Sequence, residues 1–144
     1  MKIQKVDAGP VEYHATEDGT AFRMDADTIE ACLAQAAETY RDGIVPLRLV
    51  DRGNVVLTEA GLTHEIRARH SALMLYDALV VAARAAELGV GANGHCVEDD
   101  RIVFRFKSTT RQHEVSVRKD ELLRQDTDAL AVSVFQQIHE EVQP

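Results

Sequence analysis

The longest apolar stretch of the chain runs from Ser71 to Leu88 and is interrupted only by Asp77, Arg84 and Glu87. Three charges in a segment of this length make a membrane-spanning position costly, so we expect no membrane helix. As a helix the stretch is apolar on nearly every side, and such a helix is buried all round. One small domain with one sheet covers only part of that surface. Either the protein's own core wraps this helix, or a second chain shares it.

Small residues favour the second alternative, because they let another backbone approach closely. Ala78, Ala82 and Ala86 recur at four-residue spacing, and Asp77 has no basic residue three or four positions away. A buried Asp77 needs a partner from outside the helix, so we place it at the rim of an interface. The predicted partner interface consists of Asp77, Ala78, Val81, Ala82, Arg84 and Ala86.

The formal charge of −8 is concentrated in the two flanks of the chain. Residues 1–62 hold 6 basic and 11 acidic side chains, residues 63–118 hold 8 and 7, and residues 119–144 hold 2 and 6. Acidic flanks argue against a nucleic-acid partner. They favour a protein partner, which is either a basic target protein or a second copy in a homo-oligomer.

A length of 144 residues and ordinary apolar and charged fractions are typical of one globular domain. We predict a single α+β domain over residues 1–144 with a mostly antiparallel sheet of hairpins. The order is ββ-α-ββ-α-βββ-α, and the second of the three helices is long and largely buried. The expected hairpin turns are 17–19, 51–54 and 99–100, and the expected helix caps are Asp25 or Asp27, then Thr63, then Asp126 or Thr127.

The segment Gly89-Val-Gly-Ala-Asn-Gly94 matches the glycine spacing of a dinucleotide-binding loop. Such a loop must follow a strand and open a helix, so that the helix N-terminus meets the phosphates. Here the glycines follow a predicted helix and precede a predicted strand. We interpret Gly89 as a helix stop and Asn93-Gly94 as a turn, and we expect no cofactor.

Histidine and cysteine spacing predicts neither a metal site nor a nucleophile. His64-Glu65 begins like a zinc-protease motif, but position 68, where the second histidine belongs, is alanine. His95 and Cys96 are neighbours in a predicted strand and point to opposite faces. Two cysteines, Cys32 and Cys96, form no disulfide framework, and we interpret both as reduced core residues.

The hairpin 101–118 is locally basic, and its exposed strip consists of Arg101, Arg105, Lys107, Arg111 and Arg118. Contact with RNA or DNA would also need aromatic side chains on that face, whereas Phe104 and Phe106 alternate to the other side. A solvated face, or contact with acidic segments, is the simpler interpretation.

The leading hypothesis is a non-enzymatic protein-binding domain. It is either a component of a larger bacterial or phage assembly or a small acidic inhibitor or immunity-type protein. The alternative is a small enzyme or ligand-binding domain with a carboxylate and histidine cleft built from Glu12, His14, Asp51 and His95. Nucleic-acid contact through the basic hairpin is a third reading. The N-terminus lacks the apolar run of a signal peptide, so we expect a cytoplasmic protein.

Overall fold

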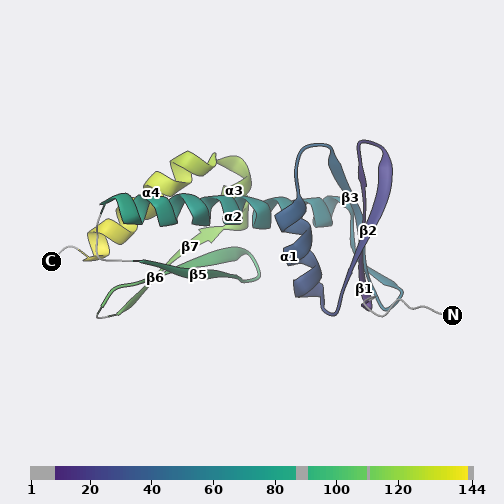
Figure 1. Ribbon diagram of the computed structural model, residues 1–144, viewed down its shortest axis with the longest axis horizontal. Helices are drawn as coiled ribbons and strands as arrows, with labels where there is room; N and C mark the ends of the chain where they lie inside the picture. Colours follow the sequence, from purple (N-terminus) through teal and green to yellow (C-terminus); the bar gives the residue numbers. More distant parts are fainter. Residues whose placement is uncertain (1–8, 87–90, 110, 143–144) are drawn as a thin grey trace. The chain divides into compact units, whose positions relative to one another are not determined.

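A computed structural model of the protein describes residues 9–86, 91–109 and 111–142, without the side chains of residues 83–86 and 141–142 (Figure 1). The chain divides into two units, Met1–His70 and Ser71–Pro144, and the boundary falls inside one long helix. The predicted α+β class and the order of strands and helices are confirmed, with one short helix added before the last one. The strands form two antiparallel sheets, one in each unit. The single-domain boundary stays a prediction.

The first unit contains a four-stranded sheet of order β2-β1-β3-β4. Its elements are β1 (Val11–Glu17), β2 (Thr20–Ala26), α1 (Ile29–Thr39), β3 (Ile44–Asp51), β4 (Asn54–Thr58) and the first part of α2 (Glu59–Ala86). Both of its hairpins turn through two residues, Asp18-Gly19 and Arg52-Gly53, and all four residues have positive φ. This backbone matches the right-handed twist of paired strands. The predicted three-residue turn 17–19 is therefore wrong by one residue.

Helices α1 and α2 cover one face of this sheet. Thr28 caps α1 by accepting a hydrogen bond from the Ala31 N–H (3.0 Å), so the predicted caps Asp25 and Asp27 are wrong. Helix α2 begins at Glu59, four residues before the predicted cap Thr63. The core of the unit is made of alternate strand residues and the inward sides of the two helices: Val11, Tyr13, Ala15, Ala26, Cys32, Leu33, Ala36, Ile44, Leu49, Leu62 and Ile66.

A buried arginine ties α1 to α2 within this unit. Arg69 is only 6% exposed, and it donates to both carboxylate oxygens of Glu30 (2.8 and 3.0 Å) and to Glu65 (2.7 Å). Burial by itself lowers the pKa of the guanidinium, but the hydrogen bonds to the two carboxylates outweigh it and raise the pKa. Arg69 therefore stays charged and joins the two helices by a bidentate pair.

The second unit contains a three-stranded sheet of order β5-β6-β7. Its elements are the rest of α2, β5 (Gly91–Val97), β6 (Arg101–Lys107), β7 (Gln112–Arg118), α3 (Lys119–Arg124) and α4 (Thr127–Val142). The core combines α2, one face of the sheet, α3 and α4: Ala72, Leu75, Leu79, Ile102, Phe104, Phe106, Val115, Val117, Leu122, Leu130, Val134 and Ile138. Asp126 caps α4, as predicted, by accepting from the Ala129 N–H (2.8 Å).

The glycine segment after α2 forms a strand. Gly91 begins β5, and Gly94 lies at an irregularity of pairing with φ of 89°, so the predicted Asn93-Gly94 turn is a bulge inside the strand. Gly89 lies outside the described residues. No helix follows these glycines directly, so the reading of the segment as a phosphate-binding loop has no structural basis.

The Arg69 tie gives a stability prediction for the first unit. We expect Arg69→Ala to lower the free energy of unfolding by about 2 kcal/mol, because two carboxylates lose charged hydrogen bonds. The matched control is Arg67→Ala, an exposed arginine of the same helix, with an expected change below about 0.5 kcal/mol. Urea unfolding followed by circular dichroism measures both. Equal effects of the two substitutions would contradict the role given to Arg69.

Candidate protein-binding surface

One face of α2 in the second unit leaves apolar side chains in water. Val81 is 65% exposed and Met74 is 49% exposed, whereas Ala72, Leu75 and Leu79 on the other side are buried. Of the large apolar residues whose side chains the structure describes, Val81 is the most exposed. A helix face in contact with water normally carries polar side chains, whereas this face carries large apolar ones.

This exposed face overlaps the partner interface that the sequence predicts. Val81 was predicted and is exposed, and Ala78 and Ala82 are half-buried beside it. Arg84 and Ala86 lie in α2, but their side chains fall outside the described residues. Met74 was not predicted, although its seven-residue spacing to Val81, about two helical turns, was a usable signal.

Asp77 lies on the same face and is exposed. Water therefore solvates its carboxylate, and the requirement for an outside partner that burial would create does not arise in the single chain. The case for an interface on α2 depends on Met74 and Val81. Asp77 places a negative charge beside Met74 and Val81, so it affects which partner fits this face.

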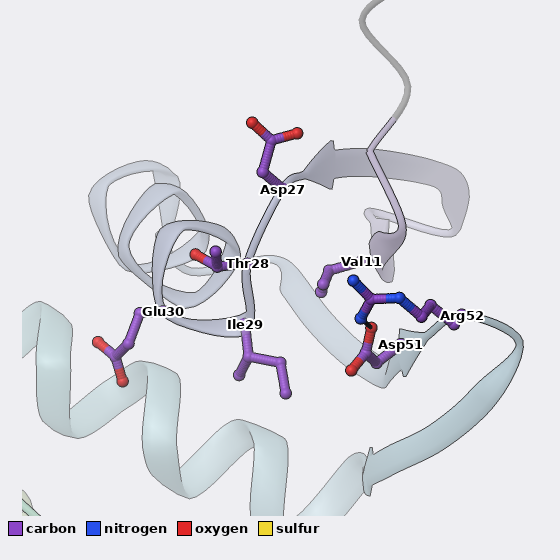
Figure 2. Close-up of a pocket in the computed structure, with 7 residues that line it drawn as sticks. All are labelled: Val11, Asp27, Thr28, Ile29, Glu30, Asp51 and Arg52. Atoms are coloured by element: carbon purple, nitrogen blue, oxygen red, sulfur yellow. Dashed lines mark hydrogen bonds and ion pairs between the residues drawn. The ribbon is translucent and has the colours of Figure 1, made fainter.

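A hollow of about 500 Å³ lies at the first turn of α1 in the first unit (Figure 2). It is lined by Val11, Asp27, Thr28, Ile29, Glu30, Asp51 and Arg52. Two of its carboxylates are already paired, since Glu30 binds Arg69 and Asp51 binds Arg52 (2.9 Å). Asp27 points away from Asp51 and Arg52 in Figure 2. The hollow therefore contains no convergent acid–base pair.

The four residues of the predicted carboxylate and histidine cleft are only partly brought together. His14 Nε2 lies 2.9 Å from Glu12 Oε1 on the face of the first sheet that α1 and α2 do not cover, and neither residue lines the hollow at α1. Asp51 lines that hollow and pairs with Arg52. His95 belongs to the second unit.

His95 packs inside the second unit between two aromatic rings. Its ring centroid lies 5.3 Å from that of Tyr76 and 5.8 Å from that of Phe104. The Tyr76 hydroxyl accepts a hydrogen bond from the Gly94 N–H (2.8 Å), which holds this end of β5 against α2. Burial lowers the pKa of His95, because it disfavours the charged ring. His95 is thus a neutral packing residue.

The two cysteines differ in their surroundings. Cys32 is fully buried in the first core, and burial, reinforced by the negative charge of Asp25, raises the pKa of its thiol to about 11. Its thiolate is therefore strongly disfavoured. Cys96 is half-buried in β5 and lies beside the Arg105 side chain. The prediction of a core residue is met by Cys32, whereas Cys96 is only partly covered.

The predicted basic strip carries its own counter-charges. Arg101 contacts Asp100 (3.5 Å), Arg105 contacts Glu114 (3.1 Å), and Arg118 contacts Asp120 (3.8 Å). The remaining members, Lys107 and Arg111, are exposed at the hairpin end. Phe104 and Phe106 are buried on the other face, as predicted. The strip is therefore a mixed-charge surface without stacking platforms.

Among the residues that the structure describes, no group of three or more His, Cys, Asp or Glu side chains is placed to hold a metal ion. Within the same ranges, no helix is both long and apolar enough to cross a bilayer.

Comparisons with protein-family models, with curated proteins and with solved structures gave no match to this chain.

The burial of His95 gives a prediction on pH. Because its pKa is lower in the folded chain than the usual value of 6.5, the unfolded chain binds more protons as the pH falls through 6.5. The stability linked to His95 is therefore present above that pH and is lost below it. We expect His95→Phe to flatten the fall in urea midpoint between pH 7.5 and pH 5.5. An unchanged fall in the variant would show that His95 is not the group responsible.

Proposed function

We propose that this chain is a non-enzymatic protein-binding domain, and that its docking surface is the face of α2 formed by Met74, Asp77, Ala78, Val81 and Ala82. The observation that carries the proposal is the exposure of Val81 and Met74 on a helix whose other side is buried in a core. Covering these two side chains removes apolar area from water, at roughly 25 cal/mol per Å².

Other exposed apolar side chains support docking less well. Val45, Val55 and Val56 lie on β3 and β4 of the first unit. Strand β4 is a short edge strand, and its pairing with β3 shifts register between Leu49 and Val50 of β3. Short, bulged edges are the means by which proteins prevent strand addition. We therefore assign the docking role to α2 rather than to this edge.

The finer roles remain proposals with less support. A component of a bacterial or phage assembly and a small acidic inhibitor or immunity-type protein both need such a surface, and the chain's formal charge of −8 suits a basic target. The cytoplasmic location stays a prediction. The carboxylate and histidine cleft and the nucleic-acid contact stay alternatives. The cleft is supported only by the Glu12–His14 pair.

The proposal is tested by capture of partners with two matched variants. Val81→Lys places a charge in the proposed surface, and Val132→Lys makes the same change at a valine of α4 that is 59% exposed. We expect a protein captured by the wild type to bind Val81→Lys at least about tenfold more weakly, a loss of about 1.4 kcal/mol. Val132→Lys should bind it as the wild type does. Quantitative mass spectrometry of affinity captures from the source cell measures all three.

Equal capture by Val81→Lys and the wild type would exclude this face of α2 as the docking surface. Circular dichroism of each variant checks that the fold is retained, which is expected because both valines are exposed.

A further inference from the structure

We propose that strand β7 pairs edge to edge with the same strand of a second copy of this chain, so that one antiparallel sheet runs through both copies. Strand β7 lies at an edge of the sheet of order β5-β6-β7. The inference goes beyond the docking face of α2 and uses other residues. Its basis is the direction of the outward backbone groups of β7 and the order of the charges along this strand.

Backbone hydrogen bonds at both ends of the β6–β7 hairpin determine which groups of β7 face away from β6. The Lys119 N–H donates to the Asp100 carbonyl, and the Ser108 N–H donates to the Arg111 carbonyl, both at 2.9 Å. Hydrogen-bonded pairs alternate along an antiparallel ladder, and the pairing of β6 with β7 has no shift of register. The residues of β7 whose backbone groups point away from β6 are therefore Gln112, Glu114, Ser116 and Arg118.

This edge of β7 is open and lacks the features that protect other edges. Its four outward residues are exposed, and in the part of the chain that the structure describes their outward backbone groups have no hydrogen-bond partner. Water is then their only partner in the single chain. The strand has seven residues without proline or glycine, whereas β5 contains a bulge and β4 is short with a shifted register. Strand β7 is therefore able to accept another strand.

The charges on β7 complement the same strand running in reverse. Glu114 and Arg118 lie four residues apart on its exposed side. A twofold axis at Ser116 places Glu114 opposite Arg118 of the second copy, and Arg118 opposite Glu114 of the second copy. The outward backbone groups of the three facing pairs then exchange about six hydrogen bonds. Because opposite charges facing each other across two strands stabilise a pair, this order of charges selects a second copy as the occupant.

Other antiparallel registers lose these charge pairs. An axis between two residues would pair an outward residue with one that already bonds to β6. An axis at Val115 places Glu114 opposite Ser116, and an axis at Glu114 places this carboxylate opposite its own copy. An axis at Val117 leaves only Ser116 and Arg118 to pair. The register centred on Ser116 is the one that matches both charges.

Within one chain the two charges are only partly used. Arg105 contacts Glu114 through Oε2 (3.1 Å), and this contact leaves the second carboxylate oxygen for another donor. Arg118 lies 3.8 Å from Asp120, which is beyond hydrogen-bond distance. The side chains of Glu114 and Arg118 are 51% and 64% exposed. Both are therefore accessible to a second copy.

Strand β2 is the other edge strand with unbroken pairing, and its charges make it a poorer candidate. Its two charged residues, Arg23 and Asp25, already bind each other (3.2 Å), and Arg23 also lies 3.8 Å from Glu12. These charges are matched within one sheet, so they give no reason for a second copy to pair there.

The self-association is measured by sedimentation equilibrium of the full chain at concentrations up to about 0.5 mM. The contact is one strand wide, which is at the weak end of protein interfaces. In 0.15 M salt the repulsion between two chains of formal charge −8 is screened beyond about 8 Å. Hydrogen exchange should show that the Glu114, Ser116 and Arg118 amides become protected as the concentration rises. A chain that stays monomeric at about 0.5 mM would overturn the inference.

Charge exchange tests the register. Glu114→Arg and Arg118→Glu should each weaken self-association at least about tenfold, because like charges then face each other twice. An equimolar mixture of the two variants should associate, since each chain supplies the charge that the other lacks. The double variant Glu114→Arg/Arg118→Glu should associate as the wild type does. Failure of both the mixture and the double variant to associate would contradict the pairing.

Proline substitution tests the backbone hydrogen bonds. Ser116→Pro removes an outward N–H at the centre of the contact, and an edge strand tolerates proline where the N–H faces solvent. We expect it to abolish self-association while circular dichroism shows a retained fold. The matched control is Gln112→Pro, which removes an outward N–H of the same strand outside the paired segment and should associate as the wild type does. Equal association of Ser116→Pro and the wild type, or equal loss in both proline variants, would overturn the inference.

Val81→Lys separates this inference from the proposed function. It should leave self-association unchanged, because Val81 belongs to the docking face of α2. Loss of self-association in Val81→Lys, with no effect of the charge exchanges, would place the contact between copies on α2 and overturn the pairing of β7. The proposed function is decided separately, by the capture experiment above.

Discussion

The structure depends on one helix that serves two hydrophobic cores. The first part of α2 supplies Leu62 and Ile66 to the core of the first unit, and its later part supplies Ala72, Leu75 and Leu79 to the core of the second. In the first unit, the buried Arg69 adds a bidentate pair to α1. In the second, the helix has a sheet on one side and leaves Met74 and Val81 in water. The surface proposed for docking is the part of this helix that its own core does not use.

Much of the fold follows from local patterns. Strand and helix periods decide which side chains share a face. The strand period correctly predicted the buried side of Ile102, Phe104 and Phe106. The helix period correctly predicted that of Leu130, Val134 and Ile138. Asp126 was correctly predicted as a cap. Helix starts were less predictable, because Asp25, Asp27 and Thr28 are all good caps and the preceding strand decides between them.

The parts that failed depend on contacts between residues distant in the chain. The division of seven strands into two sheets is a question of pairing, which period alone does not determine. Arg69 is buried because Glu30, 39 residues earlier, accepts its guanidinium hydrogen bonds. Gly91 joins a strand because Lys107 of β6 pairs with it, and Gly94 lies in a bulge of the same strand. The exposed face of α2 overlaps the interface predicted from the sequence at Val81, which follows from the apolar run. The exposure of Asp77 depends on the fold and could not be predicted from that run.

The most direct test of the account is the methyl spectrum of the chain with and without a protein that it captures from the source cell. If the face of α2 is the docking surface, the methyl resonances of Met74 and Val81 shift when that protein is added, while those of the exposed Val132 on α4 stay constant. Resonances of Met74 and Val81 that do not change, with shifts confined to other surfaces, would contradict it.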